Sequence, residues 1–419
     1  MAYAFFFAYL IALLWAIPRI PFFRKAGLRK HYLQGLFLIK ALAGVAYGYF
    51  HAQRGGGDTW VYHRYGLEDL QILRSDPILF LTSIKNPGYI TGYGEFFGTA
   101  NSWWNDLDGH VFGKMLAVAH LLSGSNYYIN SLFFNLFSLG GLLLLYRVWQ
   151  HSVPIKKSLL ALAPFLVPSF IFWSSGIHKE GMLVLALGLL LYAVYFGVFE
   201  QKWGVKRVAA IVIGLLIVLV MRNYLLLPLL LGLVAFAAAK WAQPKIRPLV
   251  TYCVLFFIAG LLFFSAHLFL PGFNLPKVVI DRQEAFSVLR SPNRFASLAL
   301  EPNALSFVQH APQALYNAGF RPMIWEANNA GALLSAIEAA VIIVLCAFAL
   351  WRIQAAGWRN SLLLFCLFFS VASLLIIGYT VVFPGAIVRY RSVVLPLMLM
   401  PVMAQLLRQP AKHLRNNQP

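Results

Sequence analysis

The chain has 419 residues, of which 60% are hydrophobic and 11% charged, and its mean hydropathy is +0.71. These values exclude an ordinary soluble domain and predict an all-α polytopic membrane protein, with residues 1–419 forming a single integral membrane domain. The formal net charge of +20 is explained by the lysines and arginines that membrane proteins carry in cytoplasmic loops, next to anionic lipid. No nucleic-acid partner is therefore expected. The three cysteines lie in apolar runs and show neither metal-ligand spacing nor a disulfide framework.

Apolar runs of membrane-spanning length predict about eleven transmembrane helices. In chain order they cover residues 3–18, 33–50, 127–147, 157–173, 180–199, 207–222, 223–239, 249–270, 330–351, 360–382 and 392–408. The first run lacks a basic flank and a small-residue cleavage site, so we interpret it as a retained helix. Lys40, inside the second run, either snorkels to the interface or faces a polar cavity.

Basic residues mark one set of connections as cytoplasmic. The loop 19–32 carries five lysines and arginines and no acid, and the other connections on its side are similarly basic. With this topology the N-terminus lies outside and the C-terminus in the cytoplasm. Twelve of the fourteen acids then fall outside, which supports the assignment along the whole chain.

Two long connections are predicted on the outer side, over residues 51–126 and 271–329. Both exceed the usual loop length, and their tryptophans favour ordered packing near lipid headgroups. Residues 111–123 (VFGKMLAVAHLLS) are apolar but too short to span, so we expect an interfacial helix there.

The chain is organised around the stretch 172–181 (FWSSGIHKEG), which separates two apolar runs. His178, Lys179 and Glu180 are consecutive, and such groups are costly between membrane helices unless they face water, one another or a ligand. Lys179 is a candidate phosphate ligand, and His178 and Glu180 are candidate catalytic groups. The plain alternative is a polar loop, in which Glu180 merely suits the positive end of the helix dipole.

The first outer connection opens with three glycines followed by Asp58. Glycines allow a sharp bend, so Asp58 is expected at the membrane surface as a general base or as a ligand of a divalent cation. Tyr62 and His63 follow and are candidate substrate contacts. The alternative is an ordinary Gly/Asp turn. The glycine run lacks the lysine and hydroxyl residues of a phosphate-binding loop.

Arginines supply further candidates on the outer side. Arg222 lies at a tight turn where the positive-inside rule disfavours arginine. Arg389 and Arg391 bracket Tyr390 at the predicted end of an outer turn, where guanidinium groups suit phosphate and the ring suits a sugar. Interfacial anchoring by snorkelling is the alternative.

The end of the second outer connection contributes supporting residues. Arg321 and Glu326 lie there, and Glu338 falls inside the following span, where a carboxylate is a functional candidate by default. Glu338 alternatively pairs with Lys40 or an arginine.

These residues share one predicted layer between water and membrane. An acid there can take a proton from an acceptor hydroxyl, while cations stabilise a lipid-linked phosphate as it leaves. The donor is expected to be embedded in the membrane, because nucleotide sugars are not supplied outside the bacterial cytoplasmic membrane.

At these residues the sequence resembles the bacterial polytopic glycosyltransferases of the GT-C type. Residues 320–322 (FRP), with Trp325 and Glu326, resemble uncharacterised membrane proteins of surface-polysaccharide loci. The resemblance to the glycosyltransferases is carried by short motifs at residues 57–62 (GDTWVY), 168–180 (PSFIFWSSGIHKE) and 389–391 (RYR). It implies a polyprenyl-phosphate sugar donor, an active site on the outer face of the bacterial cytoplasmic membrane, an acid in the first loop and basic residues at the lipid phosphate.

Three functions remain open on the sequence alone. The first is transfer of a hexose or pentose from polyprenyl phosphate to a glycan or lipid acceptor. The second is a polysaccharide repeat-unit polymerase or ligase that uses a polyprenyl-diphosphate oligosaccharide. The third is a transporter or flippase of lipid-linked sugars, which Lys40 and Glu338 favour but which the lack of an internal repeat disfavours.

Overall fold

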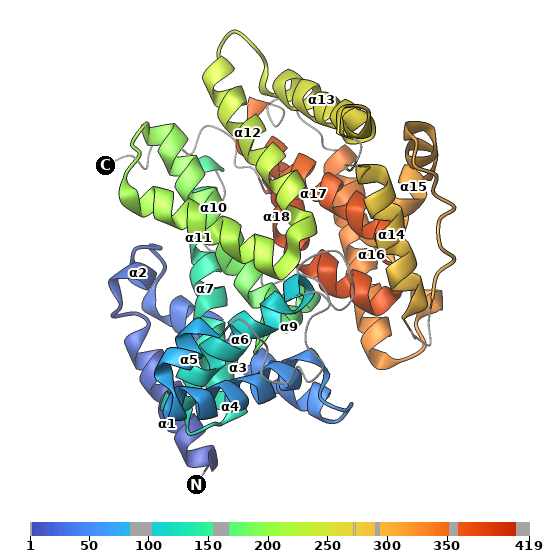
Figure 1. Ribbon diagram of the computed structural model, residues 1–419. Coiled ribbons are helices and arrows are strands. Elements are labelled where there is room, and N and C mark those ends of the chain that lie inside the picture. Colours follow the sequence, from blue (N-terminus) through green and yellow to red (C-terminus); the bar gives the residue numbers. More distant parts are fainter. Residues whose placement is uncertain are drawn as a thin grey trace. The chain divides into compact units, whose positions relative to one another are not determined.

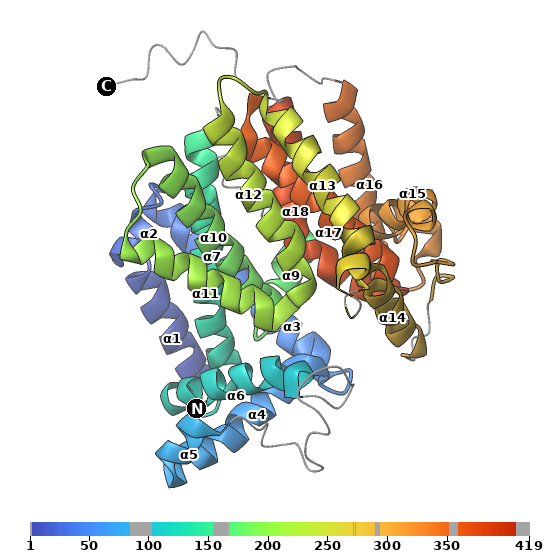
Figure 2. The same ribbon diagram turned by 45° about the horizontal axis from the view of Figure 1, so that its top comes forward.

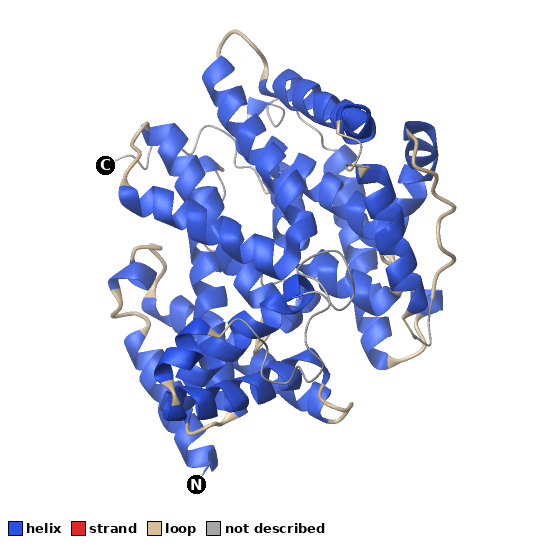
Figure 3. Ribbon diagram, in the orientation of Figure 1, coloured by secondary structure: helices blue, strands red, loops and turns tan. Residues whose placement is uncertain are grey.

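Long apolar runs form helices here because lipid offers no partner for backbone amides, which must therefore bond within their own segment. The computed structural model describes residues 2–83, 103–153, 167–270, 272, 274–289, 294–351 and 359–407. In this part of the chain the secondary structure is helical throughout, with no strand (Figure 3). The all-α prediction is therefore confirmed for the residues described.

The chain divides into two compact units. Unit 1 comprises Met1–Leu145, Ile171–Leu190 and Ala209–Asn223, and unit 2 comprises Tyr146–Phe170, Leu191–Val208 and Tyr224–Pro419. The helices in the first half of the chain are α1 (Ala2–Ala16), α2 (Pro21–Arg24), α3 (Lys30–Ala52), α4 (Gly57–Ser75), α5 (Pro77–Thr82), α6 (Trp103–Ser123), α7 (Tyr127–Ser152), α9 (Pro168–Trp173) and α10 (Lys179–Glu200). The later ones are α11 (Val205–Arg222), the 3-10 turn η2 (Asn223–Leu225), α12 (Leu226–Ala242), α13 (Pro248–Phe269), α14 (Leu275–Val288), α15 (Ala304–Phe320), the 3-10 turn η3 (Ile324–Glu326), α16 (Ala330–Trp351), α17 (Ser361–Thr380) and α18 (Pro384–Leu406).

In unit 1, helix α4 packs lengthwise against α6, and the two lie side by side in both views (Figures 1 and 2). Leu70 of α4, Phe80 of α5 and Ala117 of α6 form a small buried cluster. The ring of Tyr62 stacks on Phe112 with centroids 4.5 Å apart. The predicted first outer connection is thus a packed helical layer in its described part.

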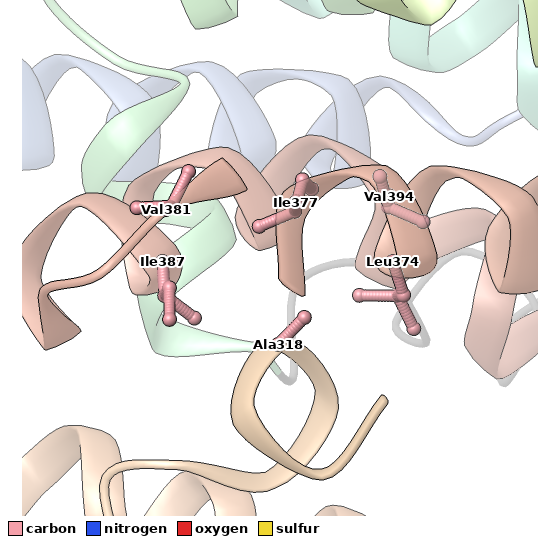
Figure 4. Close-up of a cluster of buried hydrophobic side chains, with 6 residues drawn as sticks. All are labelled: Ala318, Leu374, Ile377, Val381, Ile387 and Val394. Carbon is pink, nitrogen blue, oxygen red and sulfur yellow. The ribbon is translucent and has the colours of Figure 1, made fainter. Parts of the chain in front are cut away.

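In unit 2, α17 is the central helix and packs against α12, α13, α14, α15 and α18. A cluster of buried side chains joins three of these elements (Figure 4): Ala318, Leu374, Ile377, Val381, Ile387 and Val394. By contrast, α13 leaves a broad apolar face exposed, including Phe257, Leu261 and Leu262. Such a surface is not stable in water, so it suits contact with lipid.

Eight described helical stretches are long and apolar enough to cross a membrane. They are Lys30–Ala52, Tyr127–Ser152, Lys179–Glu200, Val205–Ala242, Pro248–Phe269, Ala330–Trp351, Ser361–Thr380 and Pro384–Leu406. The expected total of about eleven is not confirmed. The predicted spans 207–222 and 223–239 lie in one 38-residue apolar stretch, interrupted only by η2.

Other boundaries also differ from expectation. The predicted span 157–173 falls largely outside the described residues, which include only α9 from that range. Helix α1 has 15 residues and is shorter than the other apolar helices. The helix expected at 392–408 begins at Pro384, because proline suits the first turn of a helix. Placing Arg389, Tyr390 and Arg391 at the end of a turn was therefore wrong, since they lie within α18.

The connections predicted at 51–126 and 271–329 contain helices in their described parts. Residues 111–123 belong to the longer helix α6, and α14 and α15 occupy much of the second connection. Their position outside the membrane, the interfacial setting of 111–123 and the single-domain organisation stay predictions.

Candidate functional site

The site begins with the turn that leads from α9 into α10. Gly176 has a φ of +78°, a conformation that glycine adopts without steric cost. Helix α10 begins directly after this turn, at Lys179. Residues 174 to 178 and Glu180 are buried, so the stretch that the sequence singled out is enclosed by protein.

Lys40 of α3 holds this turn from one side. Its ammonium group donates to the carbonyl of Ser174 at 3.1 Å, to Ser174 Oγ at 3.0 Å and to Ser175 Oγ at 3.1 Å. The side chain is fully buried. Lys40 therefore does not snorkel, and the polar surroundings that the sequence left as its alternative include two serines and a carbonyl.

Two further helices fix the same turn through polar side chains. Asn135 of α7 accepts from the Gly176 amide at 3.0 Å and donates to the Lys40 carbonyl at 2.9 Å. Thr59 of α4 donates to the Ile177 carbonyl at 2.8 Å. Buried polar groups that are satisfied in this way specify one arrangement of the backbone.

Glu180 lies at the centre of a buried ionic group. Its Oε1 accepts from Arg222 Nη2 at 2.8 Å, and its Oε2 pairs with His178 Nδ1. The side chains of Glu180 and His178 are fully buried, whereas that of Arg222 is 12% exposed. Glu180 also lies in the first turn of α10, where the helix dipole stabilises its charge. A carboxylate that orients an imidazole is an arrangement typical of general-base catalysis.

Lys179 pairs with a carboxylate that the sequence analysis did not select. Its ammonium group contacts Asp108 of α6, and both side chains are mostly buried. The same ammonium lies 5.7 Å from the centroid of the Tyr62 ring. Asp108 precedes Lys179 by 71 positions. No spacing rule connects residues so far apart, so this pair could not be predicted from the sequence.

Aromatic rings line the imidazole of His178. The centroid of Tyr47 lies 5.2 Å from that of His178 and 5.8 Å from that of Trp173. Trp173 in turn lies 5.8 Å from His178. Aromatic faces of this kind suit the apolar faces of a sugar ring as well as a lipid chain.

Asp58 lies in the first turn of α4, also in unit 1, and is exposed. Gly55, Gly56 and Gly57 have φ angles of +82°, +97° and +57°, so the predicted sharp bend before Asp58 is present. His63, one of the predicted substrate contacts, is buried on the same helix, and the centroid of its ring lies 4.9 Å from that of His120. Burial, together with the charges of His120 and Arg64, lowers the pKa of His63 to about 4.

The remaining candidates lie in unit 2. Arg391 is fully buried, and its Nη1 donates to the carbonyls of Gly319 and Arg321 at 2.9 Å each. These carbonyls lie at the end of α15, so the guanidinium neutralises a helix C-terminus. Arg389 and Tyr390 precede it on α18 and are partly buried, with Tyr390 6.0 Å from the Tyr224 ring.

Arg321 and Glu326 pin the turn that follows α15. Arg321 Nη2 lies 2.5 Å from Glu326 Oε1, and its Nε donates to Glu326 Oε2 at 3.1 Å. Glu326 also accepts from the Met323 amide at 2.9 Å. Burial opposes ionisation of Glu326, but the bonds from Arg321 and Met323 outweigh it and hold its pKa below the usual value.

Glu338 is buried in α16 and binds the start of α9 within the same unit. It accepts from the Ser169 amide at 2.7 Å and from Ser169 Oγ at 2.6 Å. The carboxylate thereby satisfies a helix N-terminus, which is a sufficient structural reason for an acid in an apolar helix.

The predicted site residues thus separate into two groups. Unit 1 holds Asp58, Tyr62, His63, His178, Lys179, Glu180 and Arg222, and unit 2 holds Arg321, Glu326, Glu338, Arg389, Tyr390 and Arg391. Among the described residues no group of three histidines, cysteines or acids has the geometry to hold a metal ion.

Comparisons of the chain with protein-family models, with curated proteins and with solved structures found no match. The function is therefore inferred from the site itself.

Proposed function

We propose that this chain is a membrane glycosyltransferase that moves a sugar from a polyprenyl-phosphate donor to a glycan or lipid acceptor, at the outer face of a bacterial cytoplasmic membrane. The observation that carries the proposal is the buried carboxylate Glu180, which contacts both His178 and Arg222 while the adjacent Lys179 contacts Asp108. Unit 1 thereby holds an imidazole and two cations together with two carboxylate partners. They lie on α6, on α11 and at the start of α10.

The chemistry of sugar transfer needs these groups. The acceptor hydroxyl attacks the anomeric carbon, the bond from that carbon to the phosphate oxygen breaks, and the hydroxyl proton passes to a base. His178, oriented by Glu180, is the proposed base. Arg222 and Lys179 stabilise the negative charge that develops on the leaving lipid phosphate.

Asp58 is the second proposed base, in keeping with the acid expected in the first outer connection. It is exposed at the start of α4, whereas His178 is buried against aromatic rings. Asp58→Asn tests the assignment: loss of product with retained binding of the donor lipid supports Asp58, and full turnover rules Asp58 out as the base.

Several membrane helices and the distribution of basic residues support the setting. The eight apolar helices suit a polytopic protein, and the excess of acids on one predicted side suits an outward-facing site. The buried ionic group suits a lipid-linked donor, which brings its phosphate to the membrane surface without a soluble nucleotide-binding domain.

The experiment uses the purified chain in lipid nanodiscs with a radiolabelled polyprenyl-phosphate sugar and a crude surface-glycan acceptor, with and without EDTA. Transfer with release of polyprenyl monophosphate supports the proposal, and sensitivity to EDTA would assign a divalent cation to the reaction. Activity only with diphosphate-linked oligosaccharides would contradict it and identify a polymerase or ligase. Saturable lipid binding without any transfer would identify a transporter.

A further inference from the structure

A cavity in unit 2 is lined by none of the residues that the proposed reaction uses. It has a volume of about 370 Å³ and is lined by the ends of α7, α10 and α12 and the start of α17. The charge pattern predicts these helix ends on the cytoplasmic side. The cavity therefore calls for an explanation of its own.

Cationic side chains form the rim of this cavity. Lys240, Arg359 and His151 line it and are exposed, and none of the described lining residues is acidic. The acid nearest in sequence, Glu200, is engaged by Arg207 at 2.5 Å. Two full positive charges at one opening, without a carboxylate among the lining residues, favour an anionic ligand.

The floor of the cavity is polar and buried. Ser361 is 8% exposed, and its Oγ has no hydrogen-bond partner among the described residues. A buried hydroxyl without a partner is unfavourable, which indicates that a ligand or water completes it. Ser361 is also the first residue of α17, whose dipole adds positive potential at this point.

Asn360 caps the N-terminus of α17. Its Oδ1 accepts from the amides of Leu362 and Leu363 at 3.0 and 3.3 Å, and its Nδ2 donates to Ser152 Oγ at 3.2 Å. Two of the first amides of α17 are thus already satisfied. Binding at this site therefore depends on Ser361 and the cationic rim.

One wall of the cavity is apolar. Phe236 and Leu362 are buried there, and Phe199 lies at the rim with its ring centroid 5.5 Å from Lys240 Nζ. A cationic rim beside aromatic surface fits an anionic headgroup attached to a hydrocarbon chain.

We propose that this cavity binds a phosphate group, with Lys240 and Arg359 as its counter-ions and the Ser361 hydroxyl as a donor. A phosphate monoester offers acceptor oxygens for all three side chains, and charge-assisted bonds of this kind are the strong ones. The phosphate group comes either from a lipid headgroup or from a free phosphate compound. The proposal does not depend on the glycosyltransferase assignment.

The test measures binding by calorimetry on the detergent-solubilised full chain. The probes are dihexanoyl phosphatidic acid, inorganic phosphate and the zwitterionic dihexanoyl phosphatidylcholine. We expect the phosphatidic acid to bind, and Lys240→Gln, Arg359→Gln and Ser361→Ala each to weaken binding about tenfold. Lys245→Gln is the matched control, because Lys245 is an exposed cation on the same connection but outside the cavity.

The three probes distinguish the two sources of the phosphate group. Binding of inorganic phosphate with the same response to the variants indicates that the phosphate group alone suffices. Binding of the lipid only indicates that the apolar wall is also used. Equal binding by all variants and the Lys245→Gln control, with unchanged thermal unfolding, would overturn the proposal. Equal affinity for the zwitterionic lipid would overturn it as well.

Discussion

Arg222 donates to Glu180 at 2.8 Å although 42 positions separate them in the chain. The bond joins the end of α11 to the start of α10, and it places a cation against a carboxylate that has no exposed surface. An arginine that the positive-inside rule disfavours at a predicted outer turn thus has a specific partner.

The two partners of this ion pair differ in exposure, which predicts unequal mutational effects. Arg222→Gln leaves the Glu180 carboxylate buried without its guanidinium, so it should lower the free energy of unfolding by about 3 kcal/mol. Glu180→Gln should cost less, because Arg222 lies closer to solvent. In the double variant the two losses should be less than additive.

Thermal unfolding in detergent measures these effects, with Arg24→Gln as the control because Arg24 is exposed. Additive losses in the double variant would show that the pair is not coupled in solution.

Variants of Lys179 and Asp108 should show whether Lys179 binds the leaving phosphate or only forms a structural ion pair. If Lys179 holds the leaving phosphate, Lys179→Gln should slow sugar transfer about 100-fold, equivalent to about 2.7 kcal/mol of transition-state stabilisation. Asp108→Asn removes only the partner of Lys179 and should retain most of the rate. Single-turnover transfer rates with saturating donor make the comparison. Equal loss in the two variants would indicate a structural ion pair.

Arg391 should act mainly on the stability of unit 2. Its guanidinium satisfies carbonyls at the end of α15, so Arg391→Gln should lower the free energy of unfolding by about 3 kcal/mol. Arg391→Lys should lose less unfolding free energy than Arg391→Gln, because it keeps the positive charge although an ammonium reaches fewer acceptors. Denaturant unfolding is the measurement, and Lys245→Gln is the control. An unchanged unfolding midpoint in Arg391→Gln would remove this structural role and return Arg391 to the phosphate-binding candidates.

Asp69 should make stability depend on pH. Burial raises its pKa to about 6, with Lys114 opposing and Glu68 adding to the shift. The unfolded chain releases this proton at lower pH than the folded chain does, so the contribution of Asp69 is lost as pH rises from about 4 to about 6. The lowered pKa of His63 acts in the opposite direction over a similar range.

The difference in unfolding free energy between wild type and Asp69→Asn isolates the carboxyl group from His63. It should change across this range and be constant above about pH 7. A flat difference from pH 4 to 7 would show that Asp69 titrates normally.

Much of the site could be read from the sequence because membrane helices make polar residues conspicuous. Residues 178–180 were identified because they are charged or titratable groups between two apolar runs. Arg222 was identified because the positive-inside rule disfavours an arginine at a predicted outer turn. The glycines before Asp58 also predicted the bend that the backbone makes there.

What the sequence could not supply were contacts between distant positions. Asp108 is an ordinary acid in a helix until α6 brings it to Lys179. Lys40 had two possible environments, and only the packing of α3 against the 174–175 turn decides between them. The start of α18 was missed because charged residues near Arg391 resembled a helix boundary, whereas Pro384 sets the first turn.

The most direct test of the proposed function is the release of polyprenyl monophosphate by His178→Gln in nanodiscs, compared with wild type and with the exposed control His31→Gln. We expect wild type and the control to form product, while His178→Gln binds the donor lipid with unchanged affinity and forms product at least about 100-fold more slowly. Full turnover by His178→Gln would contradict the assignment of the base. No release of polyprenyl monophosphate by the wild type would contradict the proposed function itself.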